Sequence, residues 1–586
     1  MGEACCRIDD HRILAPAPEG AAGPGIARAF GYAPSRWGTR RDFLKRTLVT
    51  TAGLTGLDFL RYFTRNGIPQ DSRAWAMAAD AAQAREPHFL IYWFLEGGWE
   101  GYDMFNPLQT ANNVIHRLPD VSLERYRVLR WGEPGYTIER QGGIRYGYLA
   151  EPGKELLPEM AILSSMHTGS FHSGDRLKAH MGSYNLRLQA ERQDDERDVM
   201  QAFAEVYGQP FVLPNLAWQY WLSDGELNEL QYTGRKGYYH ALGPVWAHTI
   251  YGGTPANMKQ FLMRMQATSS DAVNRQIRSF LDSAQRLVRD DANIEAVKSY
   301  HSARGIYEHL AQAGLRLDRS LLSRLFTDPE LREEFRVKPE DELISYQSVN
   351  GNKARTKFSP NVNVQAMMTY ELMRAGLSCA FWIESRDIRR FDSHLNRSGL
   401  WNKDGSPRGQ SDQTQMMKEN LWEPLLALVR RLKSTQHGNS GKSLWDLTTI
   451  VLTSEFGRTI HGDVEEIKKM KIPDEDKQKM IDGQDISQHW KVTSAAFLGG
   501  TVKGGQQLGG VGEKTMLAIP LLPDGTMDPA FDPVTGELIP GRQPHPKSSI
   551  PDHGDVYATA LYLSGIDPKV RGRNERPPLR CVKRGT

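Results

Sequence analysis

The chain has 586 residues, of which 39% are hydrophobic and 24% are charged, and its formal net charge is +3. This composition indicates an ordinary soluble globular protein, and the near-neutral balance gives no indication of nucleic-acid binding. The length is sufficient for one large α/β domain with insertions or for two to three smaller domains.

The four cysteines are Cys5, Cys6, Cys379 and Cys581. None of them has CxxC or CxxH spacing, which argues against a zinc site made of thiolates. Cys379 lies in LSCAFWI and is predicted to be a small buried hydrophobic residue. In an oxidising compartment Cys379 could instead pair with Cys581, and the sequence leaves this alternative open.

The N-terminal 78 residues contain the best-defined signal. TRRDFLK (Thr39–Lys45) resembles the twin-arginine export motif, and a mildly apolar stretch, LVTTAGLTGL, follows it. That stretch is shorter than the roughly 20 apolar residues of a membrane span. AWAMAA (Ala74–Ala79) offers small residues for a signal peptidase, so we expect the mature chain to begin near Ala79. The alternative is an ordinary basic amphipathic helix.

Export by this route predicts a periplasmic or secreted protein whose partners include the twin-arginine export machinery. About forty residues precede the arginines, and the region before the cleavage site contains Asp58, Arg61 and Arg65. Both features depart from the usual signal. No other segment approaches spanning length, so we expect no transmembrane anchor in the mature chain.

The mature chain repeats a pattern of an apolar strand, a loop rich in glycine and polar residues, and an amphipathic helix. The expected strands are 88–94, 160–164, 377–383, 448–453 and 492–498, and the expected helices include 364–376, 412–434 and 555–565. Nearly continuous apolar runs are typical of parallel strands that are buried on both faces. The alternation therefore predicts an α/β fold with a doubly wound, mostly parallel sheet.

Three segments interrupt this pattern. Residues 185–360 are predicted to form a mostly helical insertion or cap, between a first part of the core at 79–184 and a second part at 361–586. Residues 463–480 are dense in charge and are interpreted as a solvated surface segment. Residues 520–551 are rich in proline and glycine, and we expect their aspartates Asp524, Asp528 and Asp532 to form turns rather than a calcium site.

Ligands of an open α/β sheet bind outside the carboxyl ends of its strands, where this chain places many acidic and imidazole side chains. Those after the first strand are Glu96, Glu100 and Asp103, and the second strand is followed by His167, Thr168, His172, Ser173 and Asp175. Later loops contain Asp392 and His394, then Glu455 and Arg458, then Asp485 and His489, and finally Asp552, His553 and Asp555.

Convergence of these side chains is what a divalent-metal hydrolase needs. Oxygen and nitrogen ligands suit Zn, Mn, Mg or Ca, and two ions about 4 Å apart can clamp an in-line displacement. An arginine such as Arg458 can hold a phosphate or sulfate oxygen in a bidentate grip. Taken singly, each such residue is more often a cap or a turn former, and the chain has no GxSxG elbow and no P-loop.

Several of these fragments also carry a family resemblance. FLEGGWEGYD, FHSGD, FDSHLN, LTSEFGRT, QHW with FLGGTVKGG, and DVYATALYLSGIDP occur in an order similar to that of the domain-of-unknown-function 1501 (DUF1501) proteins, from about residue 88 to 570. The resemblance implies an alkaline-phosphatase-like α/β core, related to the phosphatase/sulfatase superfamily, with a two-metal site. His172, Ser173, Asp392, His394, Glu455, Gly457, Arg458 and His489 match the family pattern.

Two positions depart from the family pattern, which usually has aspartate where this chain has Glu100 and Gln488. Glutamate still ligates metals, whereas glutamine is neutral and a weak ligand. Asp103 or Asp485 is the candidate replacement.

Two functions follow as hypotheses. The first is an exported metal-dependent hydrolase of a small anionic phosphate or sulfate ester. Its expected metal ligands are Glu100, Asp103, His172, Asp392, His394 and His489, and its expected catalytic residues are Ser173 or Thr168 as nucleophile, with Glu455 and Arg458. The second is a non-catalytic exported binding or assembly protein that keeps the fold with at most one ion.

Overall fold

A computed structural model describes most of the α/β core. The described residues are 86–99, 101–107, 139–169, 175, 178–180, 182, 199–208, 210–217, 247–249, 254–268, 317–342, 345–346, 355–356, 361–385, 417–458, 474, 489–513, 517–569 and 576–585.

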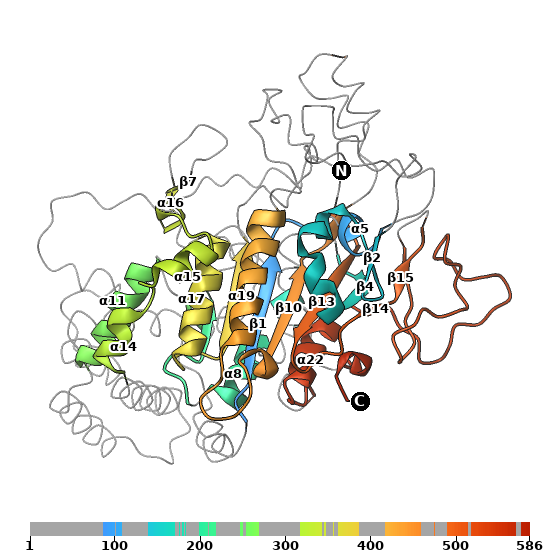
Figure 1. Ribbon diagram of the computed structural model, residues 1–586. Helices are drawn as coiled ribbons and strands as arrows, with labels where there is room; N and C mark the ends of the chain where they lie inside the picture. Colours follow the sequence, from blue (N-terminus) through green and yellow to red (C-terminus); the bar gives the residue numbers. More distant parts are fainter. Residues whose placement is uncertain are drawn as a thin grey trace, which may run out of the picture.

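An eight-stranded sheet forms the centre of the described fold (Figure 1). Its spatial order is β14-β4-β13-β10-β1-β9-β5-β6. The strands are β1 (Phe89–Leu95), β4 (Ala161–His167), β5 (Asn215–Ala217), β6 (Ala247–Thr249), β9 (Ala380–Ser385), β10 (Thr448–Ser454), β13 (Val492–Gly499) and β14 (Gln506–Leu508). Only β13 runs against its neighbours, since it pairs antiparallel with β10 and β4 while all other pairs are parallel.

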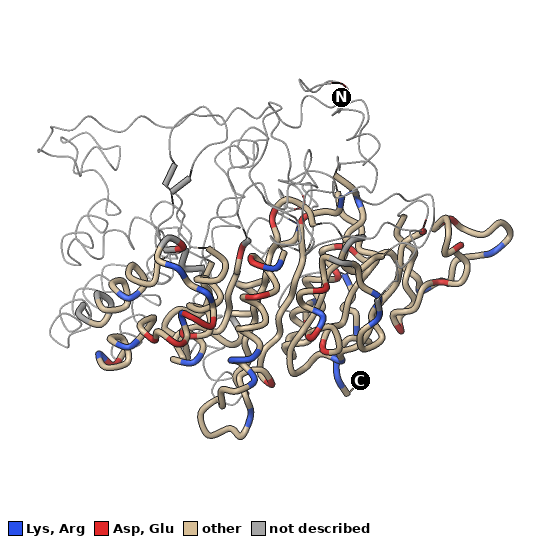
Figure 2. Tube along the Cα trace, turned by 45° about the horizontal axis from the view of Figure 1, so that its top comes forward, with Lys and Arg blue, Asp and Glu red and all other residues tan. Residues whose placement is uncertain are grey.

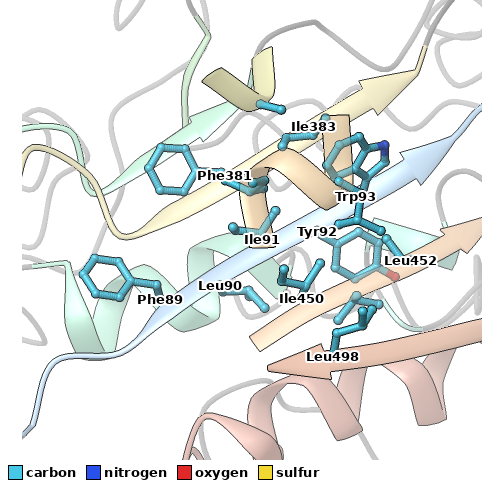
Figure 3. Packing of buried hydrophobic residues seen from close by; sticks show 14 of the residues in the cluster. Phe89, Leu90, Ile91, Tyr92, Trp93, Phe381, Ile383, Ile450, Leu452 and Leu498 are labelled. Atoms are coloured by element: carbon cyan, nitrogen blue, oxygen red, sulfur yellow. The ribbon is translucent and has the colours of Figure 1, made fainter. Parts of the chain in front are cut away.

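The central strands are apolar because both of their faces are covered. β1 is completely buried along its length, and so is β10. Side chains of β1 lie between those of β9 and β10, with Leu498 of β13 beyond them (Figure 3). His88, just before β1, packs beside Phe203 and Tyr207 of α8. Phe89 packs beside both Phe211 of the loop after α8 and His437 of the loop after α19. Elements far apart in the sequence therefore bury the start of β1.

The covering helices are long and largely buried. They are α8 (Val199–Tyr207), α17 (Val362–Arg374), α19 (Glu423–Ser434), which a π-helical turn η2 (Lys418–Trp422) precedes, and α22 (His553–Leu563). The hydroxyl group of Tyr207 in α8 donates to the carbonyl of Ser564 directly after α22, so these two helices lie together. The α/β class and the mostly parallel sheet predicted from the sequence are therefore confirmed.

The remaining elements are short or peripheral. They are α5 (Gly101–Met104), β2 (Glu139–Gln141), β3 (Ile144–Tyr146), η1 (Tyr148–Glu159), α11 (Pro255–Thr268), α14 (Arg319–Arg324), α15 (Pro329–Glu334), α16 (Pro339–Glu342), β7 (Ser345–Tyr346), β8 (Arg355–Thr356), η3 (Trp445–Leu447), β11 (Gly457–Arg458), β12 (His489–Trp490), β15 (Gly510–Val511), β16 (Ala518–Ile519) and η4 (Arg580–Val582).

Part of the segment predicted as a helical insertion contributes to the sheet. The strands β5 and β6 belong to the range 185–360, and they extend the sheet beyond β9. α11, α14, α15 and α16 belong to the same range and are helical, as expected. The sequence prediction of a mostly helical segment therefore missed its share in the core sheet.

Aspartate side chains accept hydrogen bonds from the backbone in several turns of the lobe 517–551. Asp524 accepts from the backbone N–H of Thr526, Asp528 from that of Ala530, and Asp532 from those of Val534 and Thr535. These are Asx turns, as the sequence predicted for these three side chains.

Cys379 and Cys581 are both free in the structure, and Cys379 is buried as predicted. Charges of both signs are interspersed along the described chain (Figure 2). In the described part of the chain, no helix is both long and apolar enough to cross a membrane.

Candidate functional site at the carboxyl edge of the sheet

A two-glycine turn follows β1 at the carboxyl edge of the sheet. Gly97 and Gly98 have φ angles of 108° and 79°, in the region that side chains rarely adopt. A Cβ atom on Gly98 would also lie 2.4 Å from the ring of Phe456. The turn therefore needs glycine at residue 98 for two separate reasons.

Two charged side chains from the loop after β10 hold this turn. The carboxylate of Glu455 accepts from the N–H of Gly97 at 3.0 Å, and the guanidinium of Arg458 donates to the carbonyls of Gly97 and, at 3.1 Å, Gly98. Both side chains are fully buried. Since Leu95 and Ser454 are paired at the ends of β1 and β10, the two loops begin side by side. We call Gly97, Gly98, Glu455 and Arg458 the turn clamp.

Two hydroxyl groups form hydrogen bonds with Trp99, the residue after the turn. The backbone N–H of Trp99 donates to Ser454 Oγ, which itself donates to the carbonyl of Leu95. The indole Nε1–H of Trp99 donates to Thr493 Oγ1 at 2.7 Å. Thr493 adjoins a register shift between β13 and β4, a kind of irregularity that is frequent beside active sites. These bonds hold both the backbone and the indole ring of Trp99 in place.

His489 joins this assembly through the short strand β12. It pairs with Arg458 of β11, and its ring lies 4.0 Å from the ring of Phe456, centroid to centroid. Because β13 is antiparallel, the residues that precede it lie at the same edge as those that follow the parallel strands. The structure therefore places His489 beside the loop that contains Glu455 and Arg458.

The loop after β4 supplies a second group of polar side chains. Thr168 is buried, and its N–H donates to the carbonyl of Lys491, just before β13. Asp175 is buried as well; it accepts from the N–H of Gly169 at 2.7 Å and pairs with Lys178 at 3.2 Å. His167 is exposed at the end of β4, and its pKa is lowered by partial desolvation and further by the nearby positive charges of Lys491 and Lys178.

The N-terminus of α22 lies at the same edge. The carbonyl of Pro551 accepts from the N–H of His167 at the end of β4. Asp552 and Asp555 form a capping box, and Arg576 forms ion pairs with both at 3.0 Å. Burial raises the pKa of Asp555 to about 7, and Arg576 acts in the opposite direction.

The other predicted site residues lie wholly or partly outside the described residues. Those wholly outside are Glu100, His172, Ser173, Asp392 and His394, together with Asp485 and Gln488. The backbone of Asp103 forms part of α5, but its side chain is not among those described. The sequence predictions for these residues therefore stay predictions.

A metal site can be tested only in part. Among the described residues, no group of three or more His, Cys, Asp and Glu side chains could hold a metal ion. Of the six predicted ligands, His489 is the one whose side chain is described. Its imidazole suits Zn or Mn, but the described residues do not complete a ligand set around it.

Comparison with known protein families agrees with the sequence resemblance. The family described as "Protein of unknown function (DUF1501)" matches residues 228–517. This match supports the assignment of the chain to the DUF1501 family. The DUF1501 match includes β9, β10 and β13, and it also includes Glu455, Arg458 and His489 of the site. Neither the curated proteins nor the solved structures contain a significant match.

Sequence reasoning did not foresee the hydrogen bonds that two of these residues form. Arg458 was predicted to grip an anion, yet two of its nitrogens donate to backbone carbonyls of the turn. Glu455 was a candidate without a defined partner, and its partner is the N–H of Gly97. The available signal was the pair of adjacent glycines, which predicts a turn that other residues must hold.

Proposed function

We propose that the chain is an exported metal-dependent hydrolase of a small phosphate or sulfate ester. The observation that carries this proposal is the convergence of loops at one edge of the sheet. The turn clamp joins the ends of β1 and β10, His489 lies opposite Arg458, and α22 begins beside the end of β4. Such an edge is where open α/β sheets bind their ligands.

Within this proposal, the residues of the turn clamp hold the backbone beside a proposed metal ligand. Glu455 and Arg458 fix the turn after β1, and the next residue beyond Trp99 is the proposed ligand Glu100. A side chain held to a rigid backbone is pre-organised, which favours metal binding and catalysis. When bound, a divalent ion would supply Lewis acidity and would stabilise an attacking alkoxide or hydroxide.

The remaining roles belong to the same proposal. We assign metal ligation to Glu100, Asp103, His172, Asp392, His394 and His489, and nucleophilic attack to Ser173 or Thr168. Relation to the alkaline phosphatase/sulfatase superfamily and export through a twin-arginine signal are also part of it. The DUF1501 match supports the family resemblance from which these roles were taken, and the mostly parallel sheet is compatible with the proposed core.

A non-catalytic binding or assembly protein is the second candidate. Arg458 favours the binding protein, because its buried guanidinium donates hydrogen bonds to the carbonyls of Gly97 and Gly98. Those two bonds serve the backbone of the chain and not a ligand. Gln488 also favours the binding protein, because a neutral amide stands where relatives usually have a carboxylate.

Turnover of a substrate panel separates the two candidates. The purified mature protein would be assayed against phosphate monoesters, phosphate diesters and sulfate esters with Zn, Mn, Mg and Ca. We expect turnover of at least one class and its loss in His489→Ala, while His545→Ala, at an exposed residue of the lobe 517–551, stays active. If no ester is turned over although metal is bound, the binding protein is the correct reading.

A further inference from the structure

His553 is a buried histidine that the proposed function does not use. It is the first residue of α22, and its side chain is 1% exposed. Its Nε2 atom lies 3.0 Å from the backbone carbonyl oxygen of Glu455. Its Nδ1 atom is buried and has no hydrogen-bond partner among the described residues.

The bond to Glu455 fixes the tautomer of the ring. A carbonyl oxygen only accepts hydrogen bonds, so Nε2 must carry the proton. A neutral ring protonated at Nε2 leaves a lone pair on Nδ1. Burial lowers the pKa of His553 and outweighs the opposing effects of the Glu455 bond, Asp175 and Asp552, so the ring is neutral at neutral pH.

The position of His553 places this lone pair at the carboxyl edge of the sheet. Its neighbour Pro551 is bonded to His167 at the end of β4, while His553 itself is bonded to Glu455 after β10. β13 lies between β4 and β10 in the sheet. The ring is therefore bonded to the turn-clamp loop after β10, and the segment just before it is bonded to the end of β4.

A buried acceptor without a donor is costly unless something occupies it. Leaving a buried polar group unsatisfied costs about 1–3 kcal/mol, so native structures rarely retain one without a reason. A ligand or attacking group that brings an O–H donor would satisfy Nδ1. The charged groups that influence the ring are Asp175 and Asp552, which raise its pKa, and Lys178, which lowers it.

We propose that His553 Nδ1 is an acceptor for the O–H group of a ligand at this edge. Within ester hydrolysis, which rests on the proposed function above, that group belongs to the attacking water or hydroxyl. As the new bond from oxygen to phosphorus or sulfur forms, the proton passes to Nδ1. As the ester bond breaks, the same proton passes to the departing alkoxide, and no electrons are transferred.

Two amide variants separate the two nitrogens of the ring. His553→Gln can place its amide N–H near the position of Nε2, so it keeps the bond to Glu455 and loses the acceptor at Nδ1. His553→Asn can place its amide oxygen near the position of Nδ1, so it keeps an acceptor and loses the bond to Glu455. Thermal unfolding of both variants reports on the structural bond alone.

We expect His553→Gln to unfold near the wild-type temperature and to lose about 10²-fold or more in kcat/KM, as is usual for a lost general base. We expect His553→Asn to be less stable and to retain more of the activity. The acidic limb of the kcat/KM pH profile would also disappear in His553→Gln. Wild-type kcat/KM in His553→Gln would overturn the catalytic part of the proposal.

A second measurement does not depend on turnover. Imidazole ¹⁵N spectra of the wild type, with His553 identified by its absence in His553→Gln, should give a neutral ring protonated at Nε2. Inorganic phosphate at mildly acidic pH, where it carries O–H groups, should shift the Nδ1 resonance. A proton on Nδ1, or an Nδ1 resonance that phosphate leaves unchanged, overturns the acceptor site. A phosphate response without turnover of any ester would contradict the proposed function and leave the acceptor site standing.

Discussion

Gly97 is bonded on both sides of its peptide unit by charged side chains. The carboxylate of Glu455 accepts a hydrogen bond from the N–H of Gly97, and the guanidinium of Arg458 donates one to the carbonyl of Gly97. Hydrogen bonds to charged groups contribute about 1.5–3 kcal/mol each, roughly twice the value of neutral ones. Both side chains are fully buried, so replacing either one with alanine would remove the hydrogen-bond partner of a peptide group in the turn. At the scale of single residues, charge-assisted hydrogen bonds therefore fix the backbone of the turn after β1.

Gly98→Ala tests how tightly the clamp is built. The new methyl group would meet the ring of Phe456 at 2.4 Å on a backbone with φ of 79°. Backbone strain of about 1–2 kcal/mol and overpacking of about 1–3 kcal/mol together predict a loss of roughly 2–5 kcal/mol in the free energy of unfolding. Urea or guanidinium denaturation of the wild type and the variant measures this difference in the free energy of unfolding.

Gly376→Ala is the matched control for this change. Gly376 also has a positive φ, 64°, but nothing lies within 4 Å of its Cβ position. It should pay the backbone strain alone, about 1–2 kcal/mol. Equal losses in the two variants would contradict close packing of Phe456 against the turn.

Asp555 gives the capping box a pH dependence. Its pKa is raised from 3.8 to about 7 in the folded protein, chiefly by burial. The folded state therefore binds a proton that the unfolded state has already released, so this stabilising contribution is fully present below pH 3.8 and is lost as pH rises through about 7. Its slope cannot exceed about 1.4 kcal/mol per pH unit.

We expect Asp555→Asn to remove this part of the pH dependence. The amide oxygen can still accept from the N–H of Asp552, so the cap is kept while the titration is lost. Free energies of unfolding measured from pH 4 to 7 should fall less steeply in the variant than in the wild type. Parallel curves would contradict the raised pKa.

At the scale of elements, the long buried strands could be predicted and the short ones could not. The apolar runs around β1, β4, β9, β10 and β13 each matched a strand to within a few residues. β5, β6 and β14 have three residues each, too few for any periodicity to indicate. The direction of β13 was also absent from its sequence, because strand direction depends on the connection and not on the apolar pattern.

The candidate site could be predicted as a set of loops but not as a set of contacts. Glu455, Arg458 and His489 were named from their places after or before a strand, and the structure brings them together. What they touch depends on which strands are neighbours, and the pairing of β1 with β10 is a tertiary feature. The commitment of Arg458 to Gly97 and Gly98 followed from that pairing.

At the scale of the whole molecule, the N-terminal segment predicts that the chain is exported. The paired arginines Arg40 and Arg41 precede the apolar stretch in the manner of a twin-arginine signal. We expect Arg40→Lys with Arg41→Lys to leave the full-length chain in the cytoplasm, whereas the wild-type chain is exported and shortened near Ala79. Cell fractionation and N-terminal sequencing measure both outcomes. Export of the double variant at the wild-type level would contradict this signal.

Metal stoichiometry of the purified mature protein tests the central claim most directly. We expect about one or two divalent ions per chain by elemental analysis, a clear reduction in His489→Ala, and no reduction in the surface control His545→Ala. All three proteins would be compared after the same dialysis. A wild-type protein without bound metal, even after incubation with Zn, Mn, Mg and Ca, would contradict a metal-dependent hydrolase at this edge of the sheet.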